Sequence, residues 1–144
     1  MLKVNELIKL KGGQIYYAAP NTSMRAAIEL LVEKKVGALP VISDEGLLGI
    51  LSERDIIHFL AEQGEAILEM PVSTFMTRSV VSVPSETPLE ECMQIMINRK
   101  FRHLLVREGD KFLGIISMRD MVSTLLKDRD MLIQDLEKYI IGSR

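Results

Sequence analysis

The feature that most limits what this chain can fold into is an internal repeat. Gly-Ile-Leu-Ser-Glu-Arg-Asp at residues 49–55 returns as Gly-Ile-Ile-Ser-Met-Arg-Asp at residues 114–120, 65 residues further on. At that offset, residues 23–61 align with residues 88–126 without a gap, and ten of the 39 pairs are identical. Repetition at a fixed period indicates that one supersecondary unit is used twice. Both copies should therefore have the same order of elements.

In the first copy, the hydrophobic pattern predicts the order βαββα. A short extended run stops at Pro20, and polar residues after it supply N-caps for a helix whose apolar residues recur at helical spacing. Gly37 is expected to end this helix, a tight turn joins two apolar strands, and Ser52 begins a second helix. The expected elements are an extended run at 14–20, a helix from 21–23 to 37, strands at 38–42 and 47–51, and a helix from 52.

The second copy repeats this order and divides the chain into three segments. Its expected elements are an extended run at 80–84, a helix begun by 85–88, strands at 103–106 and 112–116, and a helix from 118 to about 139. The expected segments are 1–63, with a leading helix at 1–11 and the first repeat; 64–79, the linker leading into the second repeat; and 80–144, the second repeat with its C-terminal helix.

The size of each copy predicts how the two copies assemble. A unit of about 60 residues is marginally stable alone, whereas two such units packed sheet to sheet share a core. The expected fold is therefore a mixed α/β (α+β) fold, with two βαββα repeats packed about a pseudo-twofold axis. Clefts are expected between the two copies.

Composition and charge argue against several classes of protein. The 144 residues hold 18 basic and 20 acidic side chains, so the net charge of −2 disfavours nucleic acid as a partner. No run reaches the roughly 18 apolar residues of a membrane span, and the start lacks the apolar core of a signal peptide. A cytoplasmic location is expected. The single cysteine, Cys92, excludes an internal disulfide and is expected to be a buried structural thiol.

The repeated heptapeptide places polar groups at each strand-to-helix junction. A serine at a helix start lies beside free backbone N–H groups, which favour anions. An aspartate three residues later can accept two hydrogen bonds from a vicinal diol such as a ribose, and the arginine before it can reach a phosphate. The candidate ligand-binding residues at the two junctions are Ser52, Arg54, Asp55, Ser117, Arg119 and Asp120.

The same residues also have a purely structural interpretation. A serine followed three residues later by an acid is a helix capping box, and Arg54 and Arg119 could be solvated surface residues. Capping accounts for the serine and the acid, but it does not account for an Arg-Asp doublet at both junctions. The repetition therefore favours a ligand site over capping alone.

A second feature is the basic pair Arg102-His103, which precedes the strand at 104–106 where the first copy has Gly37-Ala38. Beside a helix N-terminus that carries a serine and an arginine, two further potential cations would complete an anion site. A surface pair elsewhere would have no such role.

These motifs resemble the cystathionine-β-synthase (CBS) domain family, whose hallmark is Gly, two hydrophobic residues, Ser or Thr, two variable residues and Asp. The resemblance covers roughly residues 10–130. The chain also resembles bacterial stand-alone CBS pairs, which open with a segment like residues 4–8 followed by Lys11-Gly12 and carry segments like 36–39, 52–55 and 76–78. It implies that an adenosine-containing ligand, such as AMP, ADP, ATP, NADH or S-adenosylmethionine, binds in the clefts between the copies.

The resemblance also implies roles for individual residues. Ribose binding falls on Asp55 and Asp120, and phosphate contact falls on Arg102 and His103. The residues implied to flank adenine on the opening strands are Tyr16, Tyr17, Ala18, Val81 and Ser82. Many members have Thr or Ser where Ala18 stands, and the first copy lacks the basic pair. The two clefts are therefore expected to be unequal, with the copy that carries Asp120 providing the tighter phosphate site.

Three functions compete on the sequence alone. The first is a nucleotide sensor that signals to an unidentified target protein, and the second is a structural dimerisation module with degenerate ligand sites. The third is an enzyme, which is disfavoured because there is no nucleophile-base pair, metal cluster or Gly-rich phosphate loop. The intact serine and aspartate of both motifs favour the sensor.

The last helix predicts self-association. Its apolar residues, Met121, Val122, Leu125, Leu132 and Leu136, exceed what a module of this size needs for its own core. A homodimer built through helices is therefore expected.

Overall fold

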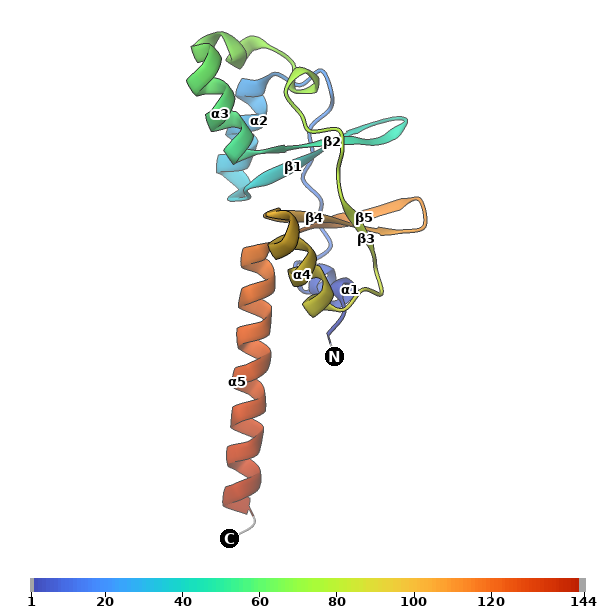
Figure 1. The fold of residues 1–144 in the computed structure, drawn as a ribbon, viewed down its shortest axis with the longest axis vertical. Coiled ribbons are helices and arrows are strands. Elements are labelled where there is room, and N and C mark those ends of the chain that lie inside the picture. The colour runs from blue at the N-terminus through green and yellow to red at the C-terminus, as the bar shows by residue number, and fades with distance from the viewer. Residues whose placement is uncertain (1, 143–144) are drawn as a thin grey trace.

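The computed structural model describes residues 2–142 and contains two similar halves (Figure 1). The predicted segments 1–63 and 80–144 also include residue 1 and residues 143–144, which lie outside the described residues. The first half contains α2 (Met24–Lys34), β1 (Ala38–Ser43), β2 (Gly46–Ser52), α3 (Glu53–Gln63) and the short 3-10 helices η1 (Gly64–Glu69) and η2 (Val72–Thr74). The second half contains β3 (Ser82–Pro84), α4 (Leu89–Arg99), β4 (His103–Glu108), β5 (Lys111–Ser117) and α5 (Met118–Gly142). Helix α1 (Val4–Leu10) comes first in the sequence and packs on this second half.

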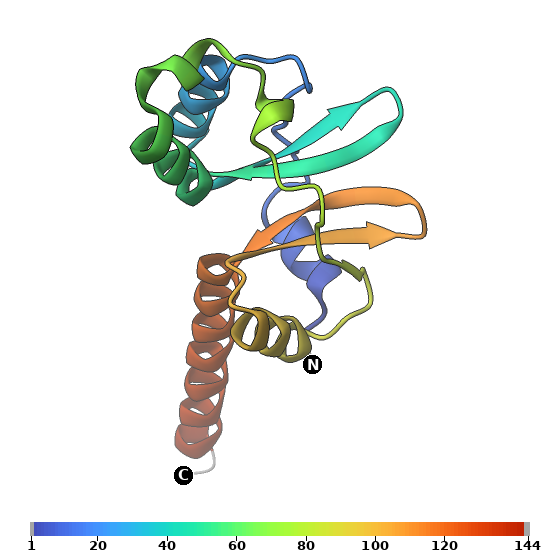
Figure 2. The same cartoon turned by 45° about the horizontal axis from the view of Figure 1, so that its top comes forward.

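The two sheets lie between the helices of the two halves (Figure 2). In each half an antiparallel hairpin forms the centre, β1 with β2 and β4 with β5, and each hairpin contains a register shift at the equivalent place. The shifts fall at Val41/Ile42 and at Val106/Arg107, 65 residues apart. The repeat in the sequence is therefore a repeat in the backbone, and the prediction of a mixed fold with two tandem repeats is confirmed.

The opening strand of the first repeat is shorter than predicted. In the second repeat, β3 pairs in parallel with β4 over three residues, but residues 14–20 contribute only a single bridge between Ala18 and Val41. The Ala18 N–H donates to the Pro40 carbonyl at 3.0 Å, and the Ile42 N–H donates to the Ala18 carbonyl at 2.9 Å. Pairing stops there because the chain before Ala18 comes from α1, which packs on the other half.

The ends of the helices differ slightly from the prediction. Helix α2 ends at Lys34 and not at Gly37, because Lys35 adopts the left-handed conformation with a φ of 55°. Lys100, its partner in the repeat, does the same after α4 with a φ of 59°. Pro88 is the N-cap of α4, at the end of the segment 85–88 that was predicted to begin this helix. The left-handed lysines place both chain reversals at the same point of the two repeats.

Each of the two hydrophobic cores includes a segment from outside its own repeat. Val4 and Leu7 of α1 are buried in the core of the second half, although α1 precedes the first repeat. Conversely, the connection after α3 is buried in the core of the first half. Its core residues are Ile67, Val72, Phe75 and Met76. The division of the chain at 63/64 and 79/80 remains a prediction, and the packing shows that each half needs a segment from outside its own repeat.

Cys92 lies in the core of the second half and is fully buried, as predicted for a structural thiol. Burial raises the pKa of this thiol to about 11, with the nearby Glu91 carboxylate adding to the effect. A thiol with such a pKa is almost entirely protonated at neutral pH and therefore a poor nucleophile.

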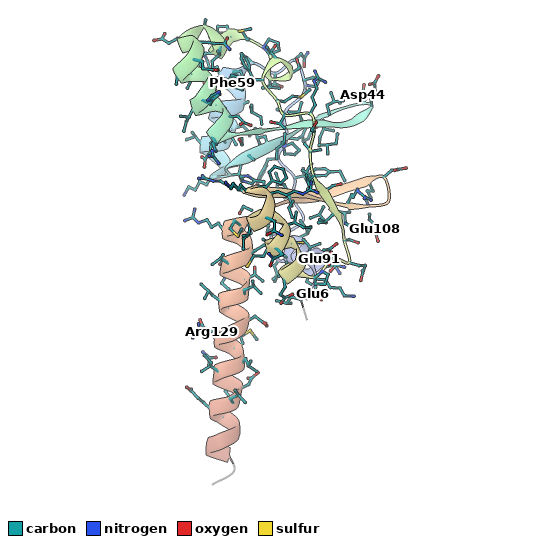
Figure 3. All side chains as sticks on the ribbon, in the orientation of Figure 1. Glu6, Asp44, Phe59, Glu91, Glu108 and Arg129 are labelled. Carbon is teal, nitrogen blue, oxygen red and sulfur yellow. The ribbon has the colours of Figure 1, made fainter. Side chains whose placement is uncertain are left out.

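Helix α5 extends well beyond the body of the molecule (Figure 1). Near its start Met121 is buried and Leu125 packs on the core of the second half. Beyond that point, where Figure 3 shows side chains projecting from the helix away from the body, apolar ones remain exposed, and these are Leu126, Met131, Leu132, Ile133 and Leu136. The predicted apolar stripe thus divides into an inner part, in which Met121 and Leu125 pack on the core and Val122 stays exposed, and an outer part without a partner among residues 2–142.

Within residues 2–142, no helix combines the length and the apolar character that crossing a membrane requires.

Candidate functional site

The first candidate site begins at the N-terminus of α3. Ser52 is the N-cap of this helix, and its Oγ accepts the backbone N–H of Asp55 at 3.2 Å. The Glu53 N–H donates to the Gly37 carbonyl at 2.9 Å, which ties the helix start to the loop before β1. The Asp55 carboxylate is half-buried, and among the described residues its one hydrogen bond comes from the Thr77 hydroxyl at 3.4 Å. Both carboxylate oxygens thus retain capacity for further donors.

The equivalent aspartate of the second repeat is bonded very differently. Asp120 and Ser117 form a complete capping box: the Asp120 N–H donates to the Ser117 Oγ at 3.0 Å, and the Ser117 N–H donates to the Asp120 Oδ2 at 2.9 Å. In addition, the Lys11 ammonium lies 2.8 Å from the same Oδ2. At Asp120, the motif therefore forms the helix capping box that its structural interpretation predicts.

These bonds change the acidity of Asp120. Burial opposes ionisation of this carboxyl, but the hydrogen bonds from Lys11 and Ser117 outweigh it and hold the pKa of Asp120 below its usual value. Both of these donors bind Oδ2, so only Oδ1 of this carboxylate remains fully available to the two hydroxyls of a ribose diol.

A cleft runs from the Asp55 motif to the second repeat, and we call it cleft A. Its cavity measures about 240 Å³. It is lined by Gly37, Ile50, Ser52, Glu53, Arg54, Asp55, Thr77, Ser79, Val80, Val81, Lys100, Phe101, Arg102, His103 and Leu105. The serine, arginine and aspartate of the first motif thus share one cavity with the basic pair of the second repeat.

A second cleft, which we call cleft B, surrounds the Asp120 motif. It is larger, with a cavity of about 530 Å³. It is lined by Lys11, Lys35, Val36, Gly37, Ala38, Glu53, Arg102, His103, Ile115, Ser117, Met118, Arg119 and Asp120. Arg102 and His103 line both clefts, so they lie between the two motifs and belong to neither alone.

The two members of the basic pair have different charges at neutral pH. Burial lowers the pKa of His103 below its usual value, and the Lys11 and Arg102 charges add to this against the opposing carboxylates of Asp120 and Glu53. His103 is therefore neutral near pH 7, where it can donate or accept one hydrogen bond. Arg102 is exposed, and a guanidinium group is always protonated in proteins.

The residues predicted to flank adenine are only partly brought together. Val81 lines cleft A, next to Val80 and Ser79. The Ser82 hydroxyl accepts the Arg107 Nε–H at 2.9 Å and lies outside both clefts. Tyr16 lines a separate small cavity near α1, and Lys34 lies 5.1 Å from the centre of its ring.

The other two predicted residues of the opening run also lie away from the clefts. Tyr17 is exposed, and Ala18 is buried in the core of the first half, where it forms the bridge to Val41. Residues 16–18, which were expected to flank adenine, therefore line neither cleft A nor cleft B.

Sequence reasoning did not identify several residues that line the clefts. Phe101 offers an aromatic surface in cleft A, and Lys100 adds a cation there. Lys100 and Lys35 are an identical pair of the repeat, which was a usable signal for a shared role. Lys11 and Thr77 reach the two aspartates from segments outside each repeat, and no spacing in the sequence indicates those contacts.

Two sheet-centred halves, each with a polar cleft beside its strand-to-helix junction, define a tandem two-repeat module. The model for the CBS domain matches the chain twice, over residues 13–62 and 72–127. The chain belongs to the CBS-domain family.

Comparison with individual proteins agrees with this assignment. The structure is similar to that of a CBS-domain protein from Agrobacterium tumefaciens, with a TM-score of 0.80, 36% identity, and coverage of 84% of this chain and 91% of the other. The CBS domain-containing protein YhcV of Bacillus subtilis is 31% identical over 75% of this chain and 76% of its own length. CBSX2 of Arabidopsis thaliana, solved in complex with AMP, gives a TM-score of 0.74 at 30% identity over 90% of this chain and 99% of that one.

Proposed function

We propose that this protein is a regulatory, non-catalytic module that binds an adenine nucleotide in cleft A and signals its occupancy to a target protein. The observation that carries the proposal is the Asp55 carboxylate, which lies in a cavity with Arg54, Lys100 and Arg102 and is bonded only weakly, to Thr77. A carboxylate with spare hydrogen-bond acceptor capacity, next to cations, suits a ligand that has both a diol and a phosphate.

The parts of an adenine nucleotide match separate walls of cleft A. The ribose hydroxyls would donate to Asp55, and the phosphate would lie near the cations. Apolar side chains provide a surface for the base, and these are Ile50, Val80, Val81, Phe101 and Leu105. The Phe101 ring, which is 38% exposed, is the aromatic candidate for stacking. AMP, ADP, ATP and NADH all carry the adenosine part that these walls would recognise.

Our proposal for the clefts is the reverse of one expectation from the sequence. Cleft A, and not the cleft of Asp120, combines an available carboxylate with the basic pair. We therefore propose that cleft A is the tighter nucleotide site. The alternative function, a degenerate site with a structural role, fits the Asp120 motif, because its serine and aspartate are used in the capping box.

An adenine nucleotide should stabilise the folded chain. Ligand at a hundredfold excess over its Kd contributes about 2.7 kcal/mol of folding free energy, because only the folded chain binds it. We expect AMP, ADP, ATP or NADH to raise the melting temperature in a thermal-shift titration, with guanosine and cytidine nucleotides as matched controls. If all four adenine nucleotides leave the melting temperature unchanged, the sensor proposal fails and the structural-module function takes its place.

We also propose that the protein is a homodimer in which the outer part of α5 is covered by a second copy. Leu132 and Leu136 lie one turn apart on this exposed stretch, and an unpaired apolar stripe of this kind usually has a partner. Light scattering is expected to give the mass of two chains for the wild type, and of one chain for Leu132→Glu/Leu136→Glu. Lys127→Ala, at an exposed position on the opposite face of the same helix, serves as the control and should remain dimeric. A wild-type protein that is monomeric at micromolar concentration would contradict this assembly.

A further inference from the structure

The Lys11 ammonium is bonded to Asp120, the candidate ribose acceptor of cleft B. The ammonium lies 2.8 Å from the Asp120 Oδ2 and donates at 3.0 Å to the Ile115 carbonyl. Both acceptors belong to the strand-to-helix junction of the second repeat, and they lie 109 and 104 residues away in the sequence. The ammonium thus bonds to the carboxylate that would otherwise receive the hydroxyls of a ribose.

The position of Lys11 is fixed by the packing of α1. Val4 and Leu7 are fully buried in the core of the second half, and the Val4 N–H donates to the Thr87 carbonyl at 2.8 Å. Lys11 is the C-cap residue of this helix, with its N–H donating to the Leu7 carbonyl at 3.1 Å. The lysine is therefore carried into cleft B by a helix that is part of the core.

The two halves treat this position in equivalent ways. In the first half, the segment carrying Thr77 crosses β2 at Gly49, where an added Cβ would lie 2.6 Å from the Thr77 carbonyl oxygen. In the second half, α1 crosses β5 at Gly114, where an added Cβ would lie 3.0 Å from Ile8. Each crossing segment brings one polar side chain to the aspartate of its half: a hydroxyl at Asp55 and an ammonium at Asp120.

From this pairing we infer that Lys11 is a specificity-determining residue that competes with ribose for Asp120 and keeps cleft B closed to adenosine ligands. The inference rests on the proposed function, because it concerns the second copy of the same site. The Thr77 contact with Asp55 is long, at 3.4 Å, and its donor is a neutral hydroxyl. The Lys11 contact with Asp120 is short, at 2.8 Å, and its donor is a charged ammonium. A ligand can displace the first more easily than the second.

Lys11 adds to the positive charge that surrounds cleft B. Lys11 is 38% exposed and Asp120 is 28% exposed on their side chains, so the pair is only partly screened by water. The nearby cations Lys35, Arg102 and Arg119 line the same cleft. With Lys11 on Asp120, the cleft presents a surplus of positive charge, and the Asp120 oxygen that carries the lysine is not available to a diol.

Isothermal titration of AMP into the intact protein tests the inference through stoichiometry. We expect one AMP per chain for the wild type and two per chain for Lys11→Met, which keeps the length of the side chain and removes the ammonium. Lys9→Met removes a charge from an exposed position of the same helix and should still bind one AMP. Lys11→Gln serves as a second variant should Lys11→Met fold poorly.

A background without cleft A sharpens the test. In Asp55→Ala, adding Lys11→Met is expected to increase AMP affinity at least tenfold over Asp55→Ala alone, and a further Asp120→Ala should remove that gain. Two AMP per chain in the wild type, or no gain on removing Lys11 while the wild type binds one AMP, overturns the inference and leaves the proposed function standing. Absence of binding in the wild type and in every variant overturns both.

Discussion

Replacing Asp55 with alanine is expected to weaken AMP binding by at least about tenfold. The substitution removes the two acceptors proposed for the ribose hydroxyls, and hydrogen bonds to a charged group contribute about 1.5–3 kcal/mol each. One lost bond of this strength already corresponds to a tenfold change in Kd. The folded state should lose little stability, because the carboxylate of Asp55 accepts only the long bond from Thr77. Isothermal titration of AMP and chemical denaturation measure the two effects separately.

Asp120→Ala is the matched control, and its expected effects are the opposite. AMP affinity in cleft A should change by less than about twofold, within the scatter of mutations away from a binding contact. Stability should fall by about 0.5–2 kcal/mol, because the substitution removes one half of the capping box at the start of α5. If Asp120→Ala abolished AMP binding and Asp55→Ala did not, the assignment of the nucleotide to cleft A would be wrong.

Gly49→Ala is expected to destabilise the fold by about 1–3 kcal/mol, the usual cost of forcing an extra group into a packed site. The new Cβ would lie 2.6 Å from the Thr77 carbonyl oxygen, which is backbone and cannot rotate away. That carbonyl accepts the Ile50 N–H at 2.9 Å, and the Thr77 N–H donates back to Ile50 at 2.8 Å. The added methyl should separate this bridge and displace the wall of cleft A that carries Thr77.

Urea denaturation of Gly49→Ala and of a matched glycine variant checks this expectation. Gly37→Ala is the control, because its added Cβ would meet only side-chain atoms, Glu53 at 3.3 Å and His103 at 3.4 Å, which can shift. We expect a clearly smaller loss of stability there. Equal stability losses for the two variants would show that the crossing at Gly49 is not as tightly packed as described.

The repeat in the sequence was sufficient to predict most elements of each half, although residues 14–20 form only a single bridge in place of the expected strand. Hydrophobic periodicity and turn residues identified both hairpins and the helices after them, and Ser52 is the N-cap that the pattern predicts. Identical residues at a fixed offset predicted the same order of elements in both copies, and the structure adds that the register shifts and helix ends repeat as well. These features are local, since each depends on residues within one or two turns of the chain.

The parts that the sequence did not predict depend on contacts between distant segments. Nothing in the spacing of Lys11 indicates that it reaches Asp120, because the contact requires α1 to pack on the other repeat. The same holds for the basic pair. Counting by repeat assigned Arg102 and His103 to the motif of Asp120, whereas the packing of the two halves places them between both motifs.

The most direct test of the central claim is a crystal structure of this protein grown with AMP. The account predicts AMP in cleft A, with its ribose hydroxyls within hydrogen-bonding distance of the Asp55 carboxylate and its phosphate beside Arg54 or Arg102. It also predicts Lys11 still bonded to Asp120 in the same crystal. AMP bound only in cleft B, with its ribose on Asp120 and Lys11 displaced, would contradict the account.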